Sequence, residues 1–134
     1  MSETQTFSAG TVERIGNILK ITYTKKEVIS IGDQKEITGI REKLFGKEKY
    51  VCLVDMRAEN LQFTDEARKY VTYNKTIKKL RIAEVLLVNN FAEELLIHSY
   101  VRFARSEDKV TVMSNEEDAI FWLNTQYDKE MITA

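Results

Sequence analysis

Asp55 and Arg57 are the first residues whose types and spacing could do chemistry. Asp55 closes the short, nearly continuous apolar run Tyr50–Asp55, and Arg57 follows two residues later. Such a run is typical of a strand buried on both faces in a parallel sheet, and open α/β sheets bind ligands at the carboxyl ends of these strands. A carboxylate and a guanidinium there could bind a polar ligand or serve an enzyme. The favoured interpretation is structural: the aspartate ends the strand by accepting hydrogen bonds from nearby backbone N–H groups.

The other side chains that could react lack the partners that catalysis or metal binding requires. His98 is the only histidine and Cys52 the only cysteine. We expect His98 on the polar side of a helix, because one histidine without acidic or cysteine partners has little chemistry available. We expect Cys52 to be buried and unreactive inside a strand. The sequence therefore predicts no metal site and no catalytic residue.

Glycine-rich loops that hold phosphate groups are absent from the sequence. No glycine follows Gly46, so neither the dinucleotide fingerprint nor the P-loop occurs in its usual place after a strand. The tight turn of a nucleophile elbow is also disfavoured, because it needs small flanking residues. We therefore expect no cofactor and a protein that is not an enzyme.

The charge and hydropathy patterns exclude two further classes of partner. With 20 basic and 21 acidic residues, the net charge is −1. The chain therefore lacks the excess of positive charge that is typical of a nucleic-acid-binding protein. The start of the chain has no secretory signal pattern, and no apolar run approaches the roughly 20 residues that a membrane-spanning helix needs. We expect a cytoplasmic protein that neither binds nucleic acid nor inserts into a membrane.

Composition and periodicity predict one α/β domain. The 134 residues, 43% of them hydrophobic and 31% charged, suit a single hydrophobic core. Residues 1–10 are predicted as a polar tail and residues 11–134 as the domain. A β-hairpin turning at Gly16 and Asn17 leads into alternating helices and strands, which implies a mixed, largely parallel sheet with about four helices. The strands are expected at residues 11–15, 18–23, 50–55, 82–88 and 109–113, and the helices at 33–45, 64–79, 91–105 and after a capping box at 114–117.

The helix expected at residues 91–105 carries more apolar surface than one sheet contact requires. Its apolar residues cover well over half of the helix circumference, whereas a helix on one sheet face needs a stripe of roughly 100° or somewhat more. A neighbouring helix, a ligand or another subunit must bury the surplus. Among the specific alternatives we favour self-association, with Leu96, Tyr100 and Phe103 as the candidate contacts.

The order of these elements resembles the STAS domain, the fold of the bacterial anti-sigma-factor antagonists. The likeness is closer to small uncharacterised bacterial STAS-like proteins and covers about residues 11–124. Those proteins carry a strand of the form Leu-Val-Asp-x-Arg, a helix opening with Ser/Thr and Glu-Ala-Arg, an Ala-x-Leu-Leu-Val strand and a final helix with acidic-Ala-x-x-Trp-Leu. The matching segments here are Leu53-Val54-Asp55-Met56-Arg57, Thr64-Asp65-Glu66-Ala67-Arg68, Ala83-Glu84-Val85-Leu86-Leu87-Val88 and Glu117-Asp118-Ala119-Ile120-Phe121-Trp122-Leu123.

The resemblance places Thr64 at the position of a serine that a partner kinase phosphorylates in the antagonists. Phe63 stands where the antagonist motif has an aspartate, and Asp65 and Glu66 stand where it has serine and glycine. Two carboxylates beside Thr64 would repel a phosphate group and partly imitate one. Capping of the following helix by Thr64 is therefore favoured over phosphorylation.

The resemblance implies a non-enzymatic regulatory domain that acts through contacts with a protein partner, as in partner switching. The expected contact surface is the helix start at Thr64, Asp65 and Glu66, with Asp55 and Arg57 beside it. STAS-like folds also resemble domains that hold nucleotides or lipids, so the alternative is a small-ligand- or lipid-binding module. A homodimer is a further expectation.

Overall fold

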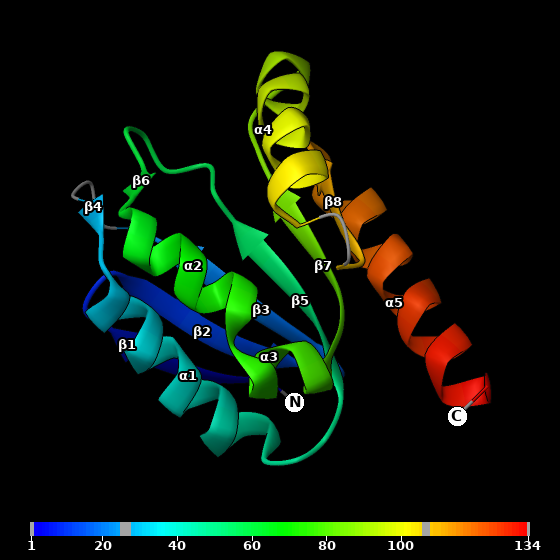
Figure 1. Ribbon diagram of the computed structural model, residues 1–134. Helices are drawn as coiled ribbons and strands as arrows, with labels where there is room; N and C mark the ends of the chain where they lie inside the picture. Colours follow the sequence, from blue (N-terminus) through cyan, green and yellow to red (C-terminus); the bar gives the residue numbers. More distant parts are fainter. Residues whose placement is uncertain (1, 25–27, 106–107, 134) are drawn as a thin grey trace.

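The computed structural model describes residues 2–24, 28–105 and 108–133, apart from the side chains of residues 2, 103 and 104. Strands and helices alternate along most of the chain, as Figure 1 shows. The strands are β1 (Ser2–Phe7), β2 (Gly10–Ile15), β3 (Ile18–Tyr23), β4 (Val28–Ile29), β5 (Tyr50–Asp55), β6 (Gln62–Phe63), β7 (Arg81–Leu87) and β8 (Val110–Met113). The helices are α1 (Ile31–Phe45), α2 (Asp65–Tyr73), α3 (Lys75–Leu80), α4 (Phe91–Ala104) and α5 (Glu116–Thr133).

The main sheet is mixed and largely parallel, which confirms the predicted fold class. Within the described residues its strand order is β1-β2-β3-β5-β7-β8. The hairpin β2–β3 turns at Gly16, whose φ of 61° is the left-handed conformation that a glycine adopts without strain. From β3 onward each neighbouring pair in this sheet is parallel. The crossover helices between the parallel strands follow from this arrangement.

The N-terminal segment corrects one prediction. Residues 1–10 were expected as a polar tail, but β1 pairs with β2 in antiparallel register along its whole length. Residues 2–6 are all polar, so this segment has no apolar alternation that would distinguish an edge strand from a tail. The strand ends at Phe7, which packs in the core with its ring edge-on to Tyr23. Gly10 then allows a close approach, because a Cβ there would lie 1.9 Å from the carbonyl oxygen of Thr22.

The helix predicted over residues 64–79 is two helices, α2 and α3, with a break at Asn74. The Asn74 backbone is extended, with ψ of 117°, and its side-chain oxygen accepts a hydrogen bond from the N–H of Ile77. Asparagine competes in this way with the helical backbone and starts a new helix. The short parallel pair β4–β6 was not predicted, because two residues per strand are too few for a period-two pattern.

The two faces of the sheet carry separate apolar clusters. Figure 1 shows α1, α2 and α3 together over one part of the sheet, with α4 and α5 near β7 and β8. α1 and α4 pack against the same cluster, through residues such as Ile37, Leu44 and Val101. α5 covers the opposite face with Ala119 and Leu123, which are both fully buried. No helix in the described part of the chain is long and apolar enough to cross a membrane.

Candidate functional site

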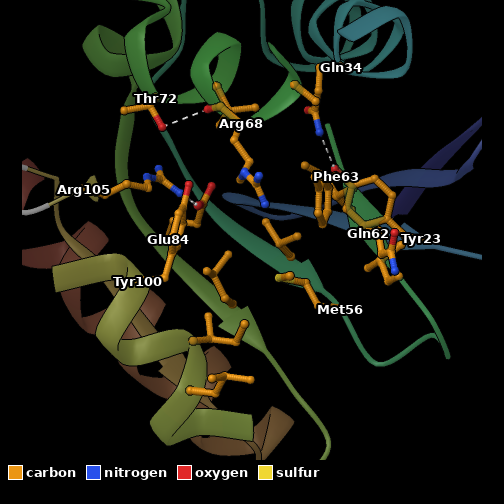
Figure 2. Close-up of a pocket in the computed structure, with 18 of the residues that line it drawn as sticks. Tyr23, Gln34, Met56, Gln62, Phe63, Arg68, Thr72, Glu84, Tyr100 and Arg105 are labelled. Carbon is orange, nitrogen blue, oxygen red and sulfur yellow. Dashed lines mark hydrogen bonds and ion pairs between the residues drawn. The ribbon is translucent and has the colours of Figure 1, made fainter. Parts of the chain in front are cut away.

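A pocket of about 630 Å³ opens between α2 and α4, above the middle of the sheet. Its floor consists of Ile21 from β3, Val54 from β5 and Leu86 from β7, and Figure 2 shows α2 and α4 on either side of it. Most of its lining is apolar, and the volume is in the range of small-molecule sites. The remaining lining residues are Tyr23, Gln34, Arg41, Met56, Leu61, Gln62, Phe63, Ala67, Arg68, Val71, Thr72, Glu84, Leu96, Ile97, Tyr100 and Arg105.

The apolar side chains of α4 that do not contact the sheet lie at this pocket and on the surface. Leu96 and Tyr100 line the pocket, yet Leu96 is 73% exposed. Phe91, at the start of the helix, is 68% exposed. Burial by a neighbouring helix, one of the three alternatives, is therefore excluded for these described side chains. The third self-association candidate, Phe103, has a side chain outside the described residues.

A cluster of buried charges forms the polar end of the pocket. Glu84, 1% exposed in the centre of β7, accepts hydrogen bonds from Arg105 Nη1 and, at 3.3 Å, from Arg81 Nη1. Asp108 completes the cluster through ion pairs with the same two arginines. Burial by itself would raise the pKa of Glu84, but the charges of Arg105 and Arg81 lower it to about 2. Glu84 is therefore ionised at neutral pH.

Arg41 enters the same region from α1 and has a neutral partner. Its Nη1 donates a hydrogen bond of 2.7 Å to the Tyr50 hydroxyl, and its guanidinium lies 5.6 Å from the centre of the Tyr50 ring. Two buried N–H groups of the cluster, Arg41 Nε and Arg105 Nη2, have no hydrogen-bond partner among the described residues. Both arginines line the pocket.

Three further ionisable side chains near the pocket, Cys52, Tyr23 and Tyr50, have raised pKa values and are neutral near pH 7. Burial raises the pKa of the Cys52 thiol to about 12 and holds the pKa of the Tyr23 hydroxyl above its ordinary value. Burial also raises the pKa of the Tyr50 hydroxyl. The expectation that Cys52 is buried is confirmed, and the raised pKa opposes formation of the reactive thiolate. His98 lies on the exposed side of α4, as its sequence position indicated.

Asp55 and Arg57 form a separate site on the α5 side of the sheet. Two parallel hydrogen bonds join Arg57 to the Asp55 carboxylate, at 3.0 and 2.8 Å, and the Arg57 N–H donates to the same group at 3.1 Å. Arg57 also pairs with Glu116 at the start of α5, and Lys20 contacts Glu116 as well. Burial would raise the pKa of Asp55, but the hydrogen bonds and charge of Arg57 lower it. The strand-ending role favoured for Asp55 is thus present in the structure.

Thr64 caps α2. Its hydroxyl oxygen accepts a hydrogen bond of 3.1 Å from the N–H of Ala67, and its own N–H donates to Ile29. Asp65 is exposed and paired with Arg68, whose proximity lowers the pKa of Asp65, and Glu66 is exposed. Successive side chains of a strand point to opposite faces of the sheet. Val54 and Met56 therefore line the pocket, whereas Asp55 pairs with Arg57 on the α5 side. No described hydrogen bond or ion pair joins the start of α2 to Asp55 or Arg57.

The polar end of the pocket was not predicted from the sequence, although two signals point to it. Glu84 is the one charged residue inside the apolar run at residues 82–88, so burial of that strand buries a carboxylate. Arg41 follows Ile37 by four residues and precedes Leu44 by three, which places it on the buried face of α1. A buried charge requires a partner, and the sequence does not show which residue supplies it.

The chain resembles known proteins in family and in fold. A family model described as a domain of unknown function, DUF7793, matches residues 12–127. A crystal structure of an uncharacterised protein of the DUF3478 family from Shewanella loihica PV-4, with a SpoIIAA-like fold, superposes with a TM-score of 0.55. It is 14% identical, and the superposition covers 92% of each chain. Curated proteins give no match. The SpoIIAA-like neighbour agrees with the STAS-like fold that the sequence predicted.

Proposed function

The chain belongs to the DUF7793 family, and we propose that it is a non-enzymatic binding module whose ligand is a small, mainly apolar molecule held between α2 and α4. The observation that carries this proposal is the pocket of about 630 Å³, with its apolar floor and walls and its buried polar end. Sites for small molecules have this combination of apolar lining and a few polar groups that orient the ligand. Ligand binding was the alternative function in the sequence analysis, and the pocket now makes it the leading one.

The apolar surface of α4 supports this function. A helix with 73% of Leu96 exposed leaves apolar area in contact with water. A ligand in the pocket would cover part of that area, because Leu96, Ile97 and Tyr100 all line the cavity. Covering apolar surface contributes roughly 25 cal/mol per Å². The same residues that make α4 unusual as a sheet-covering helix therefore suit it as a wall for an apolar ligand.

Binding of Nile red tests this function. Nile red is neutral, and its fluorescence rises in apolar surroundings. We expect saturable binding by the intact chain, and loss of binding in Val71→Trp, which puts a large ring into the pocket from α2. Phe121→Trp, which puts the same ring on the exposed side of α5, is the matched control and should bind as the unaltered chain does. Thermal unfolding of each variant checks that it is folded. Equal binding by Val71→Trp and the control would contradict the proposal.

Contact with a protein partner is the second candidate function. Arg57, with 40% of its side chain exposed, is held in place by Asp55 and Glu116 at the carboxyl end of the central strand β5. With Lys20 these groups form a fixed set of paired charges, and preorganised charges suit recognition of a partner with a complementary charge pattern. The capping role of Thr64 argues that such contacts need no phosphorylation of that residue. A pull-down from cell extract with Arg57→Ala and Thr64→Ala as baits tests this candidate, which requires a partner that Arg57→Ala loses.

Self-association through α4 is compatible with either function. Phe91, Leu95 and Leu96 form an exposed apolar surface on this helix, and a two-fold contact would place α4 against its own copy. Such surfaces on soluble domains mark interaction sites. We therefore keep the homodimer as a proposal.

A further inference from the structure

We propose that the pocket selects an amphipathic anion, whose apolar body lies between α2 and α4 and whose anionic oxygens accept hydrogen bonds from the unpartnered N–H groups of Arg41 and Arg105. This inference rests on the small-ligand binding proposed above and adds the chemical class of the ligand. A carboxylate and a phosphate ester share the chemistry that the site would recognise.

The buried cluster carries an excess of positive charge. Within the described residues it contains the three guanidinium groups of Arg41, Arg81 and Arg105 and the two carboxylates of Glu84 and Asp108. Arginine stays protonated in proteins, so the cluster has one more positive than negative charge. Both carboxylates pair with Arg81 and Arg105. The surplus charge therefore lies at Arg41.

The neighbours of Arg41 do not neutralise that charge. The Tyr50 hydroxyl contacts it, and the nearby Cys52 thiol and Tyr23 hydroxyl are protonated near pH 7. A buried cation without an anion is costly, because the low-polarity surroundings do not replace the water that it loses. An anionic ligand would supply the missing charge.

Hydrogen-bond donors at the pocket also favour an anionic ligand. Arg41 is 6% exposed and Arg105 is 7% exposed, so each is more than nine-tenths buried, and both line the pocket. The Nε–H of Arg41 and an Nη2–H of Arg105 lack partners among the described residues. Buried N–H groups of native proteins are nearly always paired. Oxygens of an anion would give these donors short, charge-assisted hydrogen bonds.

The two arginines lie at one end of the cavity. Arg105 binds Glu84 directly, and Arg41 lies near enough to lower the pKa of the same carboxylate. Figure 2 shows Arg105, Glu84 and Tyr100 together, with the Arg68 side chain extending from α2 into the cavity. Arg68 is a further cation at the opening, with 44% of its side chain exposed and its described ion pair made to Asp65. The unpaired positive charge of the polar end thus lies at Arg41, and Arg68 adds a guanidinium group near the opening.

Matched ligands that differ in the head group test the inference. Decanoate, decyl phosphate and decanol each carry a ten-carbon chain and are used to displace Nile red. The two anions are kept below their critical micelle concentrations and decanol below its solubility limit. We expect decanoate, decyl phosphate or both to bind about tenfold or more tightly than decanol, because hydrogen bonds to charged groups are stronger than neutral ones. The two anions distinguish a carboxylate site from a phosphate site.

Arg41→Met tests the residue that carries the surplus charge. The substitution removes the cation and leaves the Glu84 pairs with Arg81 and Arg105 intact. We expect the preference for the anion to disappear while decanol binds as before. Arg102→Met is the matched control, since Arg102 is exposed on α4 and does not line the pocket, and it should keep the preference.

The outcomes separate this inference from the proposed function. If Nile red and decanol bind and both anions bind no more tightly than decanol, the inference is wrong while small-ligand binding stands. Loss of the preference in Arg102→Met as much as in Arg41→Met would also overturn it, because surface charge would then explain the effect. If no probe binds the intact chain, the proposed function fails together with the inference. The comparison of the three head groups uses the intact chain, so it tests the preference for an anion even if Arg41→Met does not fold.

Discussion

Arg105 donates a hydrogen bond from Nη1 to Oε2 of Glu84, which joins the residue after α4 to the centre of β7. α4 is one wall of the pocket and β7 is part of its floor, so this buried ion pair fixes the wall to the floor at the polar end. The apolar side chains near the start of α4 are largely exposed and contribute little to holding the helix. The position of α4, and with it the shape of the pocket, therefore depends on a charged contact as well as on Val101 and Ile97 in the core.

Replacing Glu84 should destabilise the fold strongly. Glu84→Gln leaves Arg81, Arg105 and Arg41 buried with one carboxylate, Asp108, among the described groups. Removing one partner of a buried ion pair costs about 3–5 kcal/mol. Urea unfolding followed by fluorescence of Trp122, which packs on the opposite sheet face, measures the change. Glu66→Gln, at an exposed position, should change stability little, and a similarly small effect of Glu84→Gln would contradict the role of the cluster.

The same carboxylate should make stability depend on pH in the acid range. The pKa of Glu84 is about 2 in the folded chain, against an ordinary value of 4.5. A lowered folded-state pKa means that the unfolded chain binds the proton more readily, so the contribution is complete above pH 4.5 and is lost as pH falls toward 2. Unfolding free energies of the intact chain and of Glu84→Gln, measured across this range, should converge as the pH falls. A constant difference between them would contradict the prediction.

Self-association through α4 should depend on Leu96. If the exposed surface of this helix is a dimer contact, the intact chain sediments as a dimer at micromolar concentration and Leu96→Glu sediments as a monomer, because a buried unpaired charge opposes association. Phe121→Glu makes the same change at an equally exposed position on α5 and should leave the dimer intact. A chain that is monomeric at all concentrations would show that α4 has no such role.

Thr64 should matter to stability as a helix cap. Thr64→Ala removes the acceptor for the N–H of Ala67 and should cost about 1 kcal/mol of unfolding free energy. Thr64→Asn supplies another capping oxygen and should recover most of the loss, as measured by urea unfolding. An alanine variant as stable as the intact chain would contradict the capping role, and another reason for a hydroxyl at this position, such as phosphorylation, would then be favoured.

Cys52 should react with thiol reagents only after unfolding. It is fully buried between β3 and β7 in β5, and its pKa is raised to about 12, so the folded chain presents almost no thiolate. We expect very slow modification by Ellman's reagent at neutral pH and rapid modification in concentrated urea. Rapid reaction of the folded chain would mean that the centre of the sheet opens readily.

The parts of the fold that local residues determine could be predicted from the sequence. β5 was predicted with its observed bounds, because a buried parallel strand is apolar throughout. Gly46 ends α1, and Gly16 turns the hairpin, because each adopts a positive φ. Strand β1 was missed because its residues up to Thr6 are all polar, as in a tail, and the break at Asn74 was missed because one residue decided between two helices and one.

In the candidate site, too, the features set by neighbouring residues could be predicted and the contacts between distant residues could not. The sequence by itself determined that α4 has apolar surface in excess and that Asp55, two residues before Arg57, ends a central strand, because both depend on the spacing of neighbouring residues. Only the tertiary structure decided that Arg41, Glu84 and Arg105, from α1, β7 and the end of α4, meet at one end of a pocket. These three residues are far apart along the chain. Only the packing of the helices on the sheet determines which buried charged side chain contacts a group of opposite charge and which does not.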